Sequence, residues 1–326
     1  MPRVSVIIPS HNRPAMLGES IDSVRAQTHA DWELIVVDDG SDPPVEISHL
    51  GESADGRVVL LRNDRPLGQA TSRELAERVT TGDFILQLDD DDKLSPDTLA
   101  NVLRVFASHP DLGIVFLNVK GFGEGASGFD ARHSAALDKV LSAARGSPAG
   151  ADVIRFGPRL FPALLSSVPM AFQRPAARRD AWRGVTERRR RAYGDAHPLA
   201  PPLRESEWAL YAAATQAVAL LEPAHYLQRC DAQGYFSIPA KRAAAEDALA
   251  DILSHLLALS ETDPQFTAWR RAIRHALAAC HFDNAYEQLR QGSRDKALHS
   301  LVKSARARPR VKCLRLGLRI LLPWRQ

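Results

Sequence analysis

The sequence contains little cysteine and no long apolar run. Its 326 residues include only three cysteines, Cys230, Cys280 and Cys313, whose spacing matches neither a zinc motif nor a disulfide framework. We therefore expect a reducing compartment, the cytoplasm. No apolar run approaches the roughly 20 residues that a membrane-spanning helix needs. A strand pattern begins already at Val4, so we expect no signal peptide.

The chain also lacks a large excess of charge of either sign. Its formal net charge is +3, which implies no particular partner. Basic residues concentrate in the run 188–191 and after Asp295, the last acidic residue of the chain. Few aromatic residues lie among them, so we expect no nucleic-acid binding. The run 188–191 predicts a solvated surface, with an anion site as the alternative.

Four consecutive carboxylates, Asp89, Asp90, Asp91 and Asp92, directly follow the apolar stretch 84–88. Like charges at this spacing repel one another, so the run has an electrostatic cost. The stretch before it has the composition of a buried strand, and ligands bind at the carboxyl ends of strands in open α/β sheets. Clustered carboxylate oxygens favour Mg²⁺ or Mn²⁺, with a phosphate group as the other partner.

Strand patterns alternate with helical patterns over the first 120 residues. The expected strands are 4–8, 32–37, 58–61, 83–88 and 113–117. This alternation predicts an α/β fold with a Rossmann-like, mostly parallel sheet flanked by helices. We expect an insertion or mobile loop over 121–157 and a helix over 205–221.

Beyond Pro239 the pattern is wholly helical, which predicts a first domain over 1–236 and a helical extension over 237–326. The expected helices are 240–259, 266–280, 282–291 and 294–307. In the segment 311–324, apolar residues can share one helical face while basic residues flank it. This pattern predicts either peripheral contact with an anionic membrane, at its inner face, or packing back on the domain.

Three blocks together resemble the family-two glycosyltransferases with the GT-A fold. The blocks are residues 4–13 (VSVIIPSHNR), 36–41 (VVDDGS) and 88–92 (LDDDD). The resemblance implies inverting transfer of a hexosyl or N-acetylhexosaminyl group from a nucleotide diphosphate sugar to a glycan or lipid-linked glycan. It also implies a divalent metal, Mn²⁺ or Mg²⁺.

The resemblance carries site roles onto matching positions of this chain. A carboxylate such as Asp39 can accept the imide N–H of uracil, which favours a UDP-sugar. Asp91 is the expected metal ligand, and Asp92 is expected to cap the next turn. The nucleotide is expected to be bound by Pro9, His11, Asp39, Arg73, Asp89 and Asp90.

The resemblance also implies a catalytic base in an acidic pair before an aromatic residue, well downstream of the aspartates. The matching segment is Glu205-Ser206-Glu207-Trp208, where the family usually has Glu-Asp. Glu207 is the first candidate for the base and Glu205 is the second.

Three functions are compatible with these features. The first is a metal-dependent glycosyltransferase; the Gln-x-x-Arg-Trp motif and membrane spans of processive relatives are absent, which favours single addition. The second is a catalytically inactive assembly subunit that binds a nucleotide sugar or glycan, which the altered acidic pair would favour. The third is a nucleotidyltransferase, but the loop from Pro9 to Pro14 lacks the glycines typical of that class.

Overall fold

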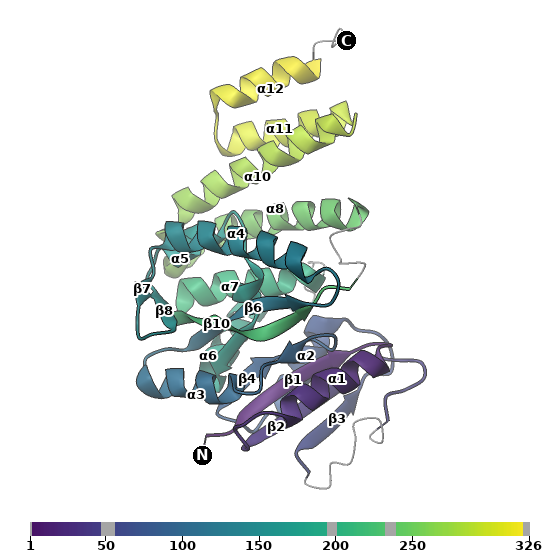
Figure 1. The fold of residues 1–326 in the computed structure, drawn as a ribbon. Coiled ribbons are helices and arrows are strands. Elements are labelled where there is room, and N and C mark those ends of the chain that lie inside the picture. The colour runs from purple at the N-terminus through teal and green to yellow at the C-terminus, as the bar shows by residue number, and fades with distance from the viewer. Residues whose placement is uncertain (1, 47–55, 194–200, 232–238, 322–326) are drawn as a thin grey trace.

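The computed structural model describes residues 2–46, 56–193, 201–231 and 239–321 (Figure 1). In these residues ten strands form one sheet with the order β3-β2-β1-β4-β9-β6-β10-β8-β7, and β5 pairs with β10. The strands are β1 Val4–Ser10, β2 Trp32–Asp38, β3 Val58–Arg62, β4 Phe84–Gln87, β5 Lys93–Leu94, β6 Ile114–Phe122, β7 Ser147–Pro148, β8 Val153–Phe156, β9 Pro175–Arg178 and β10 Val218–Arg229.

Helices cover the sheet and continue beyond it. They are α1 Pro14–Arg25, α2 Gln69–Val79, α3 Thr98–Ser108, α4 Ala126–Ala144, α5 Leu160–Leu164, α6 Arg179–Tyr193, α7 Pro201–Thr215, α8 Pro239–Thr262, α9 Pro264–Thr267, α10 Arg270–Arg290, α11 Arg294–Ala307 and α12 Val311–Leu321. The α/β class predicted from the sequence is confirmed. No helix in the described part of the chain is both long and apolar enough to cross a bilayer.

Strand β1 lies at the centre of the parallel half of the sheet. All seven of its residues are buried, and it pairs in parallel with both β2 and β4. The register places Ser10 opposite Asp38, and Ile7 opposite Gln87. The loops that follow β1, β2 and β4 therefore leave the sheet at the same edge, as expected for parallel strands.

The other half of the sheet is mixed. Strand β9 lies antiparallel between β4 and β6, and β10 pairs in parallel with β6 but antiparallel with β8. The helix predicted over 205–221 was therefore wrong in its last residues. Helix α7 ends at Thr215, and Val218 to Leu221 begin β10. Short apolar runs such as this one do not distinguish a strand from a helix.

The insertion or mobile loop expected over 121–157 was also wrong, because the segment contains α4 and the hairpin β7–β8. Helix α4 buries His133, Leu137, Val140 and Ala144 against the fold. Their spacing of four, three and four residues is that of one helical face. The Gly, Ala and Ser content of the segment masked this weaker signal.

Asn12 lies just before helix α1, in the loop after β1. The helix begins at Pro14, and Asn12 lies in the left-handed region with φ 56°. Its Oδ1 accepts a hydrogen bond from the Asp42 backbone N–H at 2.9 Å. Asn12 therefore joins the loop after β1 to the loop after β2.

The run of arginines on α6 is paired with carboxylates, and only part of it is the solvated surface predicted: Arg190 and Arg191 are exposed, whereas Arg189 is buried. Each guanidinium meets a carboxylate from another turn or another element, and Arg189 is buried. The pairs are Arg188 with Asp263, Arg189 with Glu207, Arg190 with Glu74, and Arg191 with Glu187. The run therefore connects α6 to α2, α7 and the start of α9.

The main core continues from the sheet into the later helices. It includes Leu253 and Leu256 of α8 and extends to Leu277 of α10. A second, smaller core joins the end of α10 to α11 and α12, starting at Ala285. The break predicted near residue 281 is absent, since α10 is continuous. The predicted domain boundary between 236 and 237 lies outside the described residues.

Gly40 gives a test of the loop after β2. Its φ is +71°, and a Cβ there would lie 2.6 Å from the carbonyl carbon of Arg65. We expect Gly40→Ala to lower the free energy of unfolding by about 1–3 kcal/mol, because it adds both strain and a clash. Urea unfolding followed by circular dichroism measures this change. The control, Gly18→Ala in α1, meets no atom within 4 Å and should be neutral or stabilising by up to about 1 kcal/mol. Equal effects of the two substitutions would contradict the assignment.

Candidate functional site

The polar residues singled out in the sequence meet at the carboxyl edge of β1, β2 and β4. Asp39 follows β2 and its backbone N–H bonds to the Ser10 carbonyl at 2.8 Å. The aspartate run follows β4, and Asp90 accepts a hydrogen bond from the Ser10 hydroxyl at 2.8 Å. Ser10 thus connects the two acidic loops at one edge of the sheet.

Asp39 organises the loop that faces it across this edge. Its carboxylate accepts hydrogen bonds from the Asn63 side chain at 2.7 Å and from the backbone N–H groups of Leu67 and Gly68 at 2.9 and 2.8 Å. Burial tends to raise the pKa of Asp39, but these hydrogen bonds outweigh it and hold the pKa below its usual range. Asp39 is therefore held in one orientation as an ionised carboxylate at this edge of the sheet.

The other two residues expected near a nucleotide base differ in accessibility. His11 is exposed, and its Nδ1 lies 2.9 Å from the carbonyl oxygen of Asp39. The hydrogen bond orients the imidazole ring, and the ring remains accessible to solvent beside Asp39. Pro9 is buried within β1, opposite Val37, so it shapes the base of the loop.

Three arginines meet the carboxylates at the start of the aspartate run. Asp89 forms ion pairs with Arg73 and Arg174. Asp90 and Asp91 share Arg13, at 3.1 and 2.8 Å.

Asp92 is fully buried and does not cap the next turn as predicted. Its Oδ1 accepts the backbone N–H of Arg229 at 2.8 Å, and its Oδ2 lies 3.4 Å from Arg174. Asp92 therefore connects the aspartate run to β10.

The electrostatic cost expected of the run appears in its pKa values. Burial raises the pKa of Asp90 to about 6 and that of Asp92 to about 8. Burial and the charge of Asp89 raise the pKa of Asp91. Burial would also raise the pKa of Asp89, but Arg174 and Arg73 lower it below its usual range. The run therefore favours additional positive charge.

Three of these side chains have the arrangement of a divalent-cation site. Carboxylate oxygens of Asp89, Asp91 and Asp92 all lie within 4.8 Å of one another. Such oxygens are the ligands that Mg²⁺ and Mn²⁺ prefer, so the donor set fits the predicted metal. Asp91, the predicted ligand, belongs to this group, and its side chain is 28% exposed.

Arg13 and Arg174 are site residues that sequence reasoning missed, whereas Arg73 was expected. Arg13 stands in the first sequence block, so its proximity to the acidic loops could have been inferred. Arg174 has no such signal, since it lies 82 residues from Asp92 in the chain. Arg174 is buried and stacks over the Tyr226 ring at 4.7 Å, and the Tyr226 hydroxyl accepts the backbone N–H of Asp89.

The two candidates for the base lie in different surroundings on α7. Glu205 forms an ion pair with Arg73, which also binds Asp89. Glu207 is fully buried, and its Oε2 lies 3.2 Å from Nε of Arg189. Glu205 is therefore linked to the aspartate run through Arg73. Glu207 instead pairs with Arg189 of α6 in the interior.

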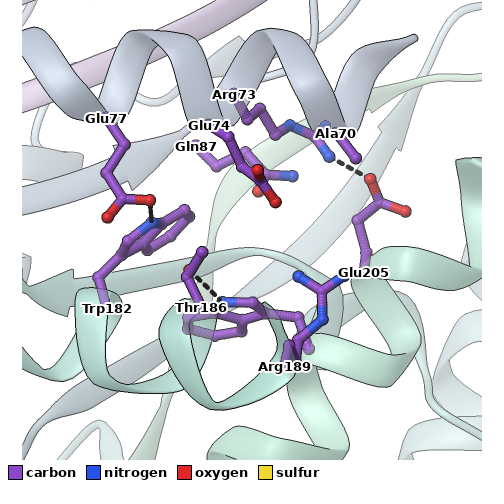
Figure 2. Close-up of a pocket in the computed structure, with 10 residues that line it drawn as sticks. Ala70, Arg73, Glu74, Glu77, Gln87, Trp182, Thr186, Arg189 and Glu205 are labelled. Atoms are coloured by element: carbon purple, nitrogen blue, oxygen red, sulfur yellow. Dashed lines mark hydrogen bonds and ion pairs between the residues drawn. The ribbon is translucent and has the colours of Figure 1, made fainter. Parts of the chain in front are cut away.

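A small cavity lies between α2, α6 and α7 beside Glu205 (Figure 2). Its volume is about 40 Å³, which suits water better than a sugar ring. Figure 2 shows Trp182 donating to Glu77 and Arg73 reaching Glu205 across the cavity. Trp208 is buried with its ring centroid 4.9 Å from that of Trp182, so it packs inside the fold.

Comparison with known proteins shows which family the sequence resembles. Residues 5–158 match the family model described as glycosyl transferase family 2. Over 89 residues, the chain is 43% identical to WfgD of Escherichia coli, a UDP-Glc:alpha-D-GlcNAc-diphosphoundecaprenol beta-1,3-glucosyltransferase. This match covers 27% of the chain and 35% of WfgD. The chain spans well under half the length of the curated relatives that it first matches.

Solved structures extend the likeness to nearly the whole chain. Residues 1–349 of TarS from S. aureus, in complex with UDP-GlcNAc, match with a TM-score of 0.56 and 14% identity, over 93% of this chain and 91% of that one. The mannosyltransferase PcManGT from Pyrobaculum calidifontis, with GDP-Man and Mn²⁺, matches with a TM-score of 0.53 and 19% identity, over 98% and 79%. Identities this low show the fold alone, which is GT-A.

Arg174 provides a test of the charge balance in the site. We expect Arg174→Met to lower the free energy of unfolding by about 3–5 kcal/mol, because Asp89 and Asp92 would lose a buried partner. Chemical denaturation of the metal-free protein measures the loss. Arg13→Met is the control, since the Arg13 side chain is 50% exposed and its pairs should contribute less than about 1 kcal/mol. If both variants lost a similar amount of unfolding free energy, burial of the ion pair would not determine the effect of the substitution.

Proposed function

We propose that this chain, whose residues 5–158 match the model of glycosyl transferase family 2, is a metal-dependent inverting glycosyltransferase. It would move a sugar from a nucleotide diphosphate sugar, a UDP-sugar, to a glycan or lipid-linked glycan. The observation that carries the proposal is the group formed by Asp89, Asp91 and Asp92. This group lies at the same edge of the sheet as the loops that contain Asp39 and His11.

The proposed donor follows from the loop chemistry and from the relatives. Asp39 and His11 stand side by side at the expected base site, and a carboxylate can accept the imide N–H of uracil. WfgD is named for UDP-Glc, and TarS was solved with UDP-GlcNAc. PcManGT was solved with GDP-Man, so the fold alone does not decide the base. A hexosyl or N-acetylhexosaminyl donor is consistent with these names.

The residues that would hold Mn²⁺ or Mg²⁺ are Asp91, with Asp89 and Asp92 beside it. When bound, the ion would neutralise charge that develops on the leaving nucleotide diphosphate. Asp90 remains with Ser10 and Arg13, which suits the predicted role at the nucleotide. Arg73, expected at the diphosphate, orients Asp89 and Glu205 in this structure.

Glu205 is the better candidate for the base that deprotonates the acceptor hydroxyl. A general base must come within hydrogen-bond reach of the proton that it removes. Glu205 lies on the side of α7 that meets Arg73 and the aspartate run, whereas Glu207 is buried against Arg189. We therefore place Glu205 in the catalytic role and Glu207 in a structural one.

One observation favours the alternative of a catalytically inactive binding subunit. Glu207, which matches the second residue of the family's acidic pair, is held in the interior by Arg189. An inactive subunit would bind a nucleotide sugar without turnover. A panel of UDP- and GDP-sugars with Mn²⁺, scored for release of nucleoside diphosphate, separates the two functions.

Asp91→Ala tests the proposed metal site. We expect metal-stimulated turnover of the preferred UDP-sugar to fall more than about 100-fold, because several kcal/mol of stabilisation of the leaving group would be lost. The panel above gives the rates, and calorimetry should show weaker Mn²⁺ binding. Asp138→Ala, at an exposed position of α4, is the matched control and should keep both properties. Turnover of Asp91→Ala at the wild-type rate would refute the site.

Glu205→Gln and Glu207→Gln separate the two candidates for the base. We expect Glu205→Gln to slow transfer about 10²–10⁴-fold with little change in nucleotide-sugar affinity, the range typical of general-base catalysis. Glu207→Gln should act mainly on stability, because it weakens a buried ion pair. Transfer rates and thermal unfolding of both variants give the answer. The reverse pattern would assign the base to Glu207, two residues further along α7.

A further inference from the structure

Helix α12 has two apolar faces, and only one of them is covered. Cys313, Leu316 and Ile320 pack in the second core against α10 and α11. The sequence alternatives of membrane contact and packing back therefore apply to different faces. The apolar residues of the other face are 58–72% exposed: Val311, Leu314, Leu318 and Leu321. Their spacing of three, four and three residues makes one continuous stripe, here called the α12 stripe.

The charges around the α12 stripe all have one sign. No acidic residue follows Asp295 in the sequence, and exposed basic side chains flank the stripe on α12 itself: Lys312, Arg315 and Arg319. Helix α12 is the outermost of the three stacked helices in Figure 1. The described part of the chain therefore presents an apolar line bordered by cations.

A basic cleft lies next to the start of the stripe. It has a volume of about 760 Å³ and lies between the first turns of α10 and the end of α11. Arg271, Arg274 and Arg308 line it, all are exposed, and none forms an ion pair with a carboxylate in the described residues. Burial and the charges of Arg308 and Arg271 lower the pKa of the neighbouring His275. Because Arg308 lies three residues before Val311, the cleft and the α12 stripe adjoin.

We propose that the α12 stripe and this basic cleft form a docking surface for an anionic lipid bilayer. Helix α12 would lie in the plane of the interface, with Leu314 and Leu318 among the acyl chains and its flanking cations at the headgroups. The guanidinium groups of Arg271, Arg274 and Arg308 would bind lipid phosphates in the cleft. This surface is separate from the aspartate run and does not depend on the proposed sugar transfer.

A second copy of the chain fits this surface less well than a bilayer does. Pairing two α12 stripes would bring Lys312, Arg315 and Arg319 against the same cations of the partner, with no carboxylate on α12 to balance them. Like charges brought together in an interface are unfavourable. An anionic bilayer offers acyl chains for the apolar side chains and negatively charged headgroups for the cations.

The experiment is flotation of the full chain with vesicles of phosphatidylcholine alone or mixed with phosphatidylglycerol. We expect binding only to the anionic vesicles, and weaker binding as salt rises. Leu314→Gln/Leu318→Gln should lose at least about tenfold in affinity. Arg271→Gln/Arg274→Gln/Arg308→Gln should lose about 100-fold, since each charge near the surface contributes about 1 kcal/mol, or fivefold. Both sets change exposed side chains, and thermal unfolding checks that the variants remain folded.

Matched controls change the same chemistry on α2 and α4, outside the α12 stripe and the basic cleft. Val79→Gln removes an exposed apolar side chain from α2. Arg132→Gln/Lys139→Gln/Arg145→Gln removes three exposed charges from α4 and its end. Both controls should float like the wild type. The proposal is overturned if the wild type fails to bind anionic vesicles, or if the controls lose as much as the two test sets. It is also overturned if light scattering shows a dimer that Leu314→Gln/Leu318→Gln dissociates.

Discussion

The repulsion among four adjacent carboxylates at the end of β4 has to be balanced where little water reaches, and much of the fold contributes to that balance. Arg13 comes from the loop after β1, Arg73 from α2 and Arg174 from the segment before β9, while β10 supplies the Arg229 backbone N–H. Segments up to 138 residues apart are thus tied to one acidic loop. The aspartate run would be destabilising without these partners, and with them it links distant segments of the chain to the sheet.

The sequence was most informative where one physical rule decides. Buried parallel strands read as apolar runs, so β1, β2 and β4 and the placement of Asp39 and Asp89 at one edge could be predicted. Strand β3 is only partly buried, and its short apolar run was still recognisable. The rest depended on partners distant in sequence. Nothing local indicates that Arg174 would face Asp92, that the arginines of α6 would be paired, or that Val218 to Leu221 would pair with β6. Helix α4 did have a readable spacing, but its small residues obscured it.

The ambiguity over the base has a geometric origin. Successive residues of an α-helix are about 100° apart, so Glu205 and Glu207 point about 200° apart around α7. One of them must face Arg73 and the other the interior. A motif match that is uncertain by two residues therefore exchanges a position beside Arg73 for one against Arg189, and only the packing of α7 against α2 and α6 decides between them.

Helix α10 belongs to both hydrophobic cores, with Leu277 in the first and Ala285 in the second. Its 21 residues span about 31 Å, so one continuous rod carries α11 and α12 away from the sheet. This continuous helix sets the distance and the angle between α12 and the acidic edge. Helix α10 therefore acts as a spacer of fixed length.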